Sequence, residues 1–474
     1  MKKPALNPYL PSWEYIPDAE PHVFGDRVYI YGSHDRFNGH VYCLNDYVCW
    51  SAPVTDLGDW RYEGVIYHKT DDPENPSGEA CLFAPDVTRG PDGRYYLSYV
   101  LNDRSDIGVA VCDEPAGEYT FYGHVQHADG TRLGSRPGDE PQFDPGLLIE
   151  GDKVYLYTGF CAIGDKSRKG AQATVLAPDM LTIVEDPVII APSEPYSAGS
   201  GFEGHEFFEA PSMRKIGDTY YLVYSSIKMT ELCYATSSSP TEGFSYCGVI
   251  ISNNDKGIDS YKPVDKPMYY GGNNHGSIVE IEGEHYVFYH RHTNGTNFSR
   301  QACAERIEIL EDGSIPQVSM SSCGLNGGPL EGKGLHYAYT ACNLFTSVDN
   351  DYTGGMGRNG FWMDATYPKI TQDGRDGDEE IGYVFNMTDT ATASFKSFRC
   401  EGIRQVTVTT RGYFEGKFEV RTAWDGDVLA EIPAHSTNEW REFRAEAAIP
   451  EGVQDLYFTY RGDRAATLLS FKLS

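Results

Sequence analysis

Short acidic phrases recur through the first 300 residues of the chain. Four of them carry a carboxylic acid, in Pro17-Asp18-Ala19-Glu20, Ala84-Pro85-Asp86-Val87, Phe143-Asp144-Pro145-Gly146 and Glu209-Ala210-Pro211-Ser212, and a fifth, Asn274-His275-Gly276, carries an imidazole. Carboxyl groups crowded into one site repel one another, so one of them can stay protonated near neutral pH. A protonated carboxyl beside an ionised one can cleave a glycosidic bond by acid and base catalysis.

A tight hairpin follows each of these phrases. It consists of a strand, a Gly-Asp, Asp-Gly or Gly-Glu turn and an aromatic strand, and the second turn residues are Asp26, Gly93, Asp152, Asp218 and Glu284. The spacings of 67, 59, 66 and 66 residues leave room for four short antiparallel strands in each unit. Five such units predict a five-bladed β-propeller in an all-β chain, whereas a β-sandwich gives no reason for this repeat.

The repeat also predicts where the phrases meet. The innermost strand of every propeller blade runs in the same direction along the central channel, so equivalent positions reach one mouth. Counting back seven to nine residues from each turn gives Asp18, Asp86, Asp144, Glu209 and His275. Each alone is more often a turn cap or a solvated charge, and only their shared register favours a common site. Rival carboxyls close in sequence are Glu20, Glu203 and Glu206.

In their order and spacing over residues 5–310, these phrases resemble glycoside hydrolase family 43, whose members are five-bladed propellers that cleave arabinofuranosyl, xylosyl and related linkages with inversion. The resemblance implies that Asp18 is the general base and Glu209 the general acid. It assigns to Asp86, expected near Glu209, the role of raising the pKa of the acid and orienting it.

The same resemblance implies further contacts around the sugar. Arg300 resembles an arginine that reaches the sugar hydroxyls, Asp144 a channel residue of the third blade, and Phe83 stands where family members often carry Trp. The implied chemistry requires no cofactor. His275 resembles a histidine that contacts a structural calcium or other cation in the propeller channel, although a lone histidine is more often structural.

The C-terminal third of the sequence has a different residue pattern from the five repeats. We expect the propeller to span residues 1–312, a Gly-, Ser- and Pro-containing linker 313–335, and a jelly-roll-like β-sandwich 336–474. The last segment resembles a family 6-type carbohydrate-binding module, most clearly at Thr437-Asn438-Glu439-Trp440. Its acidic run, residues 373–380, is typical of a solvated loop. We expect this domain to pack against the propeller and shape the rim of its pocket.

Composition restricts the partners. The formal net charge of −30 disfavours binding to nucleic acid or to an anionic membrane. The sequence has no apolar run of about 18 residues and no apolar stretch typical of a secretion signal at its start. The eleven cysteines form no Cys-x-x-Cys pair. We therefore expect a cytoplasmic protein that binds an oligosaccharide and neither nucleic acid nor membrane.

The function that these features favour is an inverting exo-α-L-arabinofuranosidase acting on arabinoxylan-type oligosaccharides. A β-D-xylosidase of the same fold is the close alternative, since the two sugars present overlapping hydroxyl patterns. A non-catalytic, carbohydrate-binding propeller is the alternative from a different class.

Overall fold

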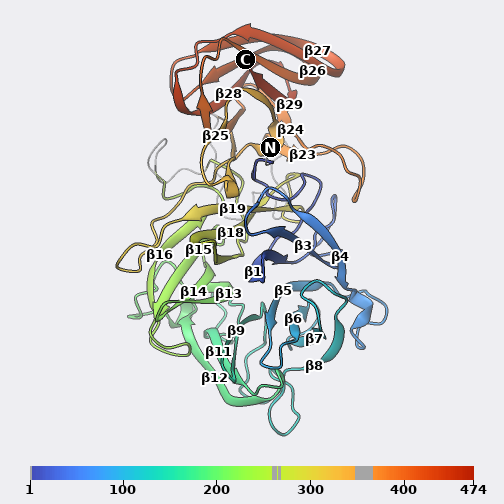
Figure 1. The fold of residues 1–474 in the computed structure, drawn as a ribbon, viewed down its shortest axis with the longest axis vertical. Helices are drawn as coiled ribbons and strands as arrows, with labels where there is room; N and C mark the ends of the chain where they lie inside the picture. The colour runs from blue at the N-terminus through green and yellow to red at the C-terminus, as the bar shows by residue number, and fades with distance from the viewer. Residues whose placement is uncertain (1–2, 259–263, 265–267, 347–366) are drawn as a thin grey trace.

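A computed structural model describes residues 3–258, 264, 268–346 and 367–474 of the chain. Five antiparallel sheets form a ring, and a second β-domain stands beside this ring at one edge (Figure 1). The described helices are four single turns, η1 (Lys69–Asp71), η2 (Glu194–Tyr196), η3 (Gly324–Asn326) and η4 (Ala338–Thr340). The predicted all-β fold, a five-bladed propeller followed by a sandwich-like domain, is confirmed.

The first three blades each contain four strands that follow chain order from the channel outwards, so each blade is a simple meander. The acidic phrases overlap the starts of the innermost strands, and in the second blade the phrase lies within the strand. The strands are β1 (Glu20–Phe24), β2 (Arg27–Tyr31), β3 (Tyr47–Pro53) and β4 (Arg61–Tyr67); β5 (Leu82–Arg89), β6 (Tyr95–Leu101), β7 (Gly108–Cys112) and β8 (Thr120–His124); and β9 (Gly146–Glu150), β10 (Lys153–Thr158), β11 (Gly170–Leu176) and β12 (Ile183–Pro192).

The fourth blade repeats this pattern, and the fifth has three strands among the described residues. The five predicted turns connect the first and second strands of their blades, and the glycine in each turn has a positive φ that other residues rarely adopt. The strands are β13 (Phe207–Ile216), β14 (Thr219–Ser226), β15 (Glu231–Ser237) and β16 (Ser245–Ser252); and β17 (Ser277–Ile281), β18 (Glu284–His292) and β19 (Arg300–Ile307).

The N-terminal segment closes the ring of blades. The Tyr9 amide donates a hydrogen bond to the Ala302 carbonyl of β19, and the side chain of Asn7 both donates to the Ala304 carbonyl and accepts from its amide. Residues before the first blade therefore lie along the last strand of the fifth. Ring closure joins parts of the chain that are almost 300 residues apart.

Among the described residues, the C-terminal domain has ten strands, and the long strand β26 pairs with three of the others. The first part of β26 pairs with β29 and its second part with β28, so this strand connects the two layers. The strands are β20 (Leu330–Glu331), β21 (Gly334–Tyr337), β22 (Asn343–Phe345), β23 (Lys369–Thr371), β24 (Tyr383–Met387), β25 (Thr392–Cys400), β26 (Gln405–Arg421), β27 (Ala430–Glu446), β28 (Gly452–Arg464) and β29 (Ala466–Leu473).

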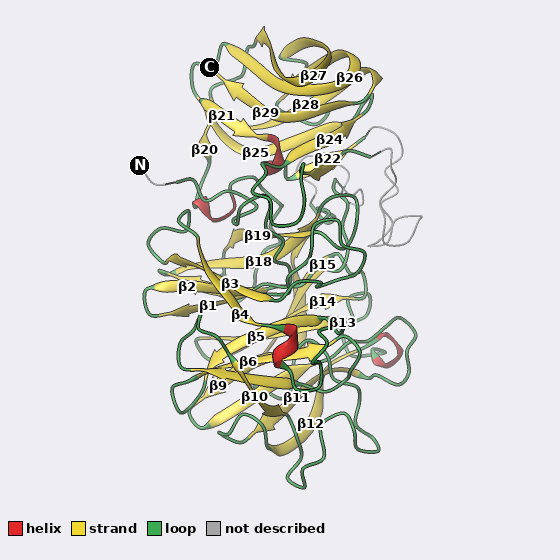
Figure 2. Cartoon of the chain, turned by 90° about the vertical axis from the view of Figure 1, so that its right-hand side faces the viewer, coloured by secondary structure: helices red, strands yellow, loops and turns green. Residues whose placement is uncertain are grey.

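The connection between the two domains is shorter than expected from the sequence. Strands β20 and β21 fall within or overlap the expected linker 313–335, yet they pair with β25 and β29 of the C-terminal domain. A hydrophobic core continues from the fourth and fifth blades through Met320 and Leu344 into this domain. Figure 2 shows the resulting stack of C-terminal domain above propeller. Among the described residues, no helix has the length and apolar character needed to span a membrane.

Candidate active site

A small pocket of about 190 Å³ lies at the mouth of the propeller channel. Six of the seven predicted site residues line it, and they come from all five blades. The lining residues are Asp18, Tyr42, Cys43, Phe83, Ala84, Phe143, Asp144, Phe160, Glu209, Asn273, His275 and Arg300. The repeat therefore brings the acidic phrases together, as the propeller geometry predicted.

A strained backbone position marks the start of four inner strands. Asp18, Ala84, Asp144 and Ala210 all have positive φ, at 57°, 33°, 47° and 65°, and they are 66, 60 and 66 residues apart. Non-glycine residues rarely occupy this region, and such strain is concentrated at functional sites. These four residues therefore occupy equivalent positions in the repeat. Asp18, Ala84 and Asp144 line the pocket, and in the fourth blade the lining residue is Glu209, which directly precedes Ala210.

Asp86 is the predicted site residue that does not line the pocket. It lies two positions beyond Ala84, so it corresponds to Glu20 in the first blade and occupies the next layer down the channel. Its Oδ1 pairs with His22 Nε2 at 2.7 Å, and its Oδ2 accepts a hydrogen bond from the Leu147 amide at 2.7 Å. The expectation that Asp86 lies beside Glu209 is therefore wrong, because the equivalent position in the second blade is Ala84.

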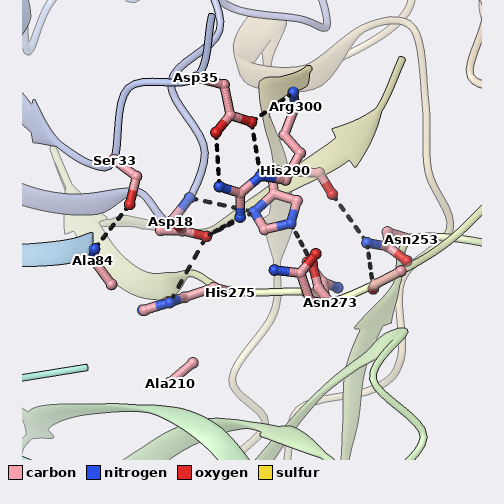
Figure 3. A network of polar contacts seen from close by, with 12 residues as sticks. Asp18, Ser33, Asp35, Ala84, Ala210, Asn253, Asn273, His275, His290 and Arg300 are labelled. Atoms are coloured by element: carbon pink, nitrogen blue, oxygen red, sulfur yellow. Dashed lines mark hydrogen bonds and ion pairs between the residues drawn. The ribbon is translucent and has the colours of Figure 1, made fainter. Parts of the chain in front are cut away.

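Arg300 holds Asp18 from the fifth blade. Its Nη1 donates a hydrogen bond to Asp18 Oδ1 at 3.0 Å, while Nε and Nη2 grip both oxygens of Asp35 at 2.8 and 2.9 Å (Figure 3). All three side chains are buried. A guanidinium shared in this way by two carboxylates fixes their orientation as well as balancing their charge.

His290 supports the backbone of Asp18. The Asp18 amide donates to His290 Nδ1 at 3.2 Å, and His290 Nε2 donates to the Asn273 carbonyl (Figure 3). This pattern requires a neutral imidazole with its proton on Nε2. Burial, together with the nearby charge of Arg300, lowers the pKa of His290 well below its ordinary value and favours this neutral form.

Glu209 and Asp144 are the pair suited to hold a proton. Burial, followed by repulsion from Asp18, raises the pKa of Glu209 to about 8. Burial also raises the pKa of Asp144, with repulsion from Glu209 and then Asp18 as the next causes. Asp144 Oδ2 accepts a hydrogen bond from the amide of Ala210, the residue after Glu209, at 3.2 Å. Asp144 therefore contacts the backbone beside Glu209, and Asp18 is the carboxylate whose charge raises the pKa of Glu209.

An aromatic wall completes the pocket. Tyr42, Phe83, Phe143 and Phe160 form a chain of ring contacts, with centroids 6.4, 5.8 and 5.4 Å apart in that order. Such rings provide apolar faces against which a sugar ring can pack. Of the four, only Phe83 was predicted. Tyr42 and Phe160 lie in irregular segments that follow no repeat, although Phe143 adjoins Asp144 in its acidic phrase.

His275 lies on the pocket wall as predicted, and its nearest charged neighbours are two carboxylates. Its Nδ1 is 3.8 Å from Asp18 Oδ1 and 3.9 Å from Asp144 Oδ2. Calcium prefers six to eight oxygen ligands. Asp18 is also paired with Arg300, and the channel cation stays a prediction.

Among the described residues, the C-terminal domain has two tryptophans whose rings could stack on a sugar, Trp424 and Trp440. Trp424 is partly exposed, and Trp440 is half-buried beneath the guanidinium of Arg411, whose Cζ is 4.1 Å from the ring centroid. That face of Trp440 is therefore already covered. The carbohydrate-binding role of the C-terminal domain remains a prediction.

A five-bladed propeller that buries a proton-holding carboxyl, a cation-paired carboxylate and an aromatic wall in one pocket has the parts of a glycoside hydrolase. The comparisons with known proteins agree with that class. A model of the glycosyl hydrolases family 43 matches residues 8–315. The chain belongs to this family, and the protein is a glycoside hydrolase.

Individual relatives support the assignment. A xylosidase/arabinosidase of Thermoclostridium stercorarium is 68% identical over 100% of this chain and 99% of its own length. A xylosidase/arabinosidase of Bacteroides ovatus is 30% identical over 60% of this chain and 87% of its own length. The structure of the β-xylosidase RS223 matches 65% of this chain and 96% of its own length, with 28% identity and a TM-score of 0.52.

A fourth comparison concerns the fold of both domains. The crystal structure of an arabinoxylan arabinofuranohydrolase from Bacillus subtilis, in complex with cellotetraose, covers 99% of this chain and 97% of its own. The identity is 22% and the TM-score 0.52. The combination of a propeller with a C-terminal β-domain thus also occurs in a solved structure.

Proposed function

We propose that the protein is an inverting, exo-acting hydrolase that releases single terminal α-L-arabinofuranosyl residues from arabinoxylan-type oligosaccharides. The observation that carries the proposal is the pocket: it is small, lies at the end of the channel, and has Asp18, Asp144, Glu209 and Arg300 on its wall. Pockets for drug-sized ligands are typically about 300–1,000 Å³. About 190 Å³ suits one pentose unit with its leaving group directed outwards.

In the proposed mechanism, Asp18 removes a proton from a water molecule on one face of the anomeric carbon. Protonated Glu209 donates to the departing oxygen on the other face, and inversion follows from this single displacement. The two carboxyl groups of such an enzyme stand about 6.5–9.5 Å apart to admit the water. The raised pKa of Glu209 supports its role as the acid, because its carboxyl keeps its proton at neutral pH.

Asp144 takes the role that the sequence assigned to Asp86. Its hydrogen bond from the Ala210 amide ties it to the backbone that carries Glu209, and repulsion from Glu209 helps to raise the pKa of Asp144 itself. Arg300 orients the base and presents its remaining surface to the pocket. Asp144 and Arg300 are thus positioning residues that also face the sugar.

A β-D-xylosidase is the second candidate. Relatives are named xylosidase/arabinosidase, β-xylosidase and arabinoxylan arabinofuranohydrolase, so the names alone favour no single sugar. The 68% identity to a protein named for both activities supports either, or both, for this pocket.

Chromogenic α-L-arabinofuranoside and β-D-xyloside substrates distinguish the two. We expect turnover of both, with the arabinofuranoside preferred in kcat/KM, and proton NMR should detect the inverted anomer as the first product. Asp18→Asn and Glu209→Gln should each reduce kcat by about 10²–10⁴-fold while the protein remains folded. A preference for the xyloside would identify the protein as a β-D-xylosidase instead. Near-normal activity of Asp18→Asn or Glu209→Gln would contradict the proposed mechanism.

A further inference from the structure

A segment of the C-terminal domain reaches the pocket side of the propeller. We call residues 369–382, which comprise β23 and the loop before β24, the arm. Its Gln372 Oε1 accepts a hydrogen bond from the Tyr15 hydroxyl at 2.7 Å, and the Gly382 amide donates to Ser12 Oγ at 2.9 Å. β23 and β24 lie on the side of their domain that faces the propeller in Figure 1, and Figure 2 shows the same for β24. The arm is therefore docked at both of its ends.

Between these ends, the Asp376 carboxylate accepts hydrogen bonds from a loop of the first blade. We call residues 36–45, which follow β2 and precede β3, the rim loop. The Phe37 amide donates to Asp376 Oδ1 at 2.7 Å, and Asn45 Nδ2 donates to Asp376 Oδ2 at 3.0 Å. One carboxylate thus holds both the beginning and the end of the rim loop. Hydrogen bonds to an ionised acceptor are stronger than those between neutral groups.

The rim loop carries two residues of the pocket wall, Tyr42 and Cys43. The Arg300 guanidinium lies over the Tyr42 ring, with its Cζ 4.7 Å from the centroid, and Arg300 Nη2 donates to Cys43 Sγ at 3.5 Å. The Cys43 amide donates to Asp35 Oδ1 at 3.0 Å. The loop is therefore packed against the arginine that holds the base.

In the sequence, Asp376 lies far beyond the repeats that form the propeller and its pocket. It falls outside the family match, which ends at residue 315, and its side chain is largely solvent-exposed. The acidic run that contains it was expected to be a solvated loop. One member of that run instead connects the C-terminal domain to the wall of the active site.

We propose that Asp376 is a positioning residue, which closes the rim loop from the C-terminal domain and thereby sets the pocket shape that binds the sugar. This inference rests on the proposed function, since it takes the pocket to be the sugar site. The contribution is to sugar binding and not to proton transfer, because the hydrogen bonds of Asp376 go to the rim loop, whereas Asp18 precedes β1 and Glu209 lies in β13.

The test compares Asp376→Ala with a matched control, Glu379→Ala, in the full-length enzyme. Glu379 is an exposed acid three residues further along the arm, so both variants lose one negative charge from the same segment. For Asp376→Ala we expect KM for the preferred chromogenic substrate to rise about tenfold, with kcat within about twofold of the parent. Glu379→Ala should leave both constants unchanged, and Asp376→Asn should lie between, because it retains one acceptor.

Hydrogen exchange provides a second readout that needs no substrate. Amides of the rim loop should exchange at least about fivefold faster in Asp376→Ala and at the parental rate in Glu379→Ala. Unchanged rim-loop exchange, an unchanged KM, or a parallel loss of kcat and folded protein would each overturn the role of Asp376. Failure of the proposed function has a different signature, since the parent enzyme itself would then hydrolyse neither substrate while the exchange comparison still reports on the rim loop.

Discussion

Arg300 donates a hydrogen bond to Asp18 at 3.0 Å, although the two residues are 282 positions apart in the chain. The first and last blades therefore meet at the proposed general base. The other side of the guanidinium is held by Asp35, so the position of Asp18 depends on a buried chain of three charged groups.

Replacing Asp35 should disturb this chain without touching the reacting groups. Asp35→Asn leaves the buried guanidinium of Arg300 with only one carboxylate, and breaking a buried ion pair from one side costs about 3–5 kcal/mol. We expect a loss of stability of this order and a fall in kcat/KM. Urea unfolding and steady-state kinetics measure the two effects, and a variant as stable and active as the parent would contradict the role of Asp35.

Asp144 and Asp86 can be distinguished by their amide variants. Asp144→Asn alters the carboxyl that accepts a hydrogen bond from the backbone beside Glu209, so kcat should fall about 10²-fold, while the alkaline limb set by burial of Glu209 and by Asp18 stays in place. Asp86→Asn weakens the contacts to His22 and Leu147 and should mainly reduce stability, by about 1–3 kcal/mol. Steady-state kinetics and urea unfolding separate the two variants, and a large fall in kcat for Asp86→Asn alone would restore the original assignment.

The pH dependence of the parent enzyme follows from Glu209. Because its pKa is raised to about 8, the acid remains protonated through neutrality and loses its proton above that value. We expect kcat/KM to fall about tenfold per pH unit on the alkaline side, with a midpoint near pH 8. A midpoint close to pH 5, typical of an ordinary carboxyl, would show that Glu209 is not the acid.

Glu209 should also reduce stability at neutral pH. Its folded-state pKa lies above the ordinary value of 4.5, so the unfolded chain releases this proton first and stability declines as pH rises from about 4.5 to about 8. The Glu209→Gln variant has no ionisable group at this position, so its stability should not decline over this pH range. Chemical denaturation should show the variant more stable than the parent by about 2–4 kcal/mol at pH 8 and equal to it at pH 4. An equal difference at both values would contradict the shift.

A buried ion pair joins the two domains. Lys396 Nζ in β25 is 3.0 Å from Asp255 Oδ2 in the propeller, and both side chains are buried. Lys396→Met removes the cation and leaves Asp255 uncompensated, which we expect to cost about 3–5 kcal/mol. Calorimetry should show a lower unfolding temperature for the whole enzyme. A loss confined to a separate C-terminal transition would argue against coupling of the domains.

The propeller could be predicted because its hairpin turns are local signals. A Gly-Asp or Asp-Gly pair between aromatic strands encodes its turn within six residues, and the spacing of the five turns gives the number of blades. Asp18, Asp144 and Glu209 then follow from ring geometry. Asp86 did not, because Ala84 stands nine residues and Asp86 seven residues before the turn, and a count of seven to nine residues admits both.

Other site residues depend on contacts that no periodicity encodes. Tyr42 and Asn273 belong to loops whose course is set by packing, and Asp35 is selected by the guanidinium of a residue 265 positions away. Asp376 is the residue that the sequence predicts least well. Its acidic neighbours are typical of a solvated loop, and its hydrogen bonds to the rim loop are evident only from the docked arm in the structure.

The N-terminal segment that lies along β19 imposes an order of events on a newly synthesised chain. Residues 7–9 have no partner strand until residues 302–304 have emerged from the ribosome, and contacts between such distant parts form late in folding. Asp18 and Arg300 come together by the same closure. A chain truncated before the fifth blade should therefore have no hydrolytic activity. During translation, activity should first appear when the ring of blades has closed.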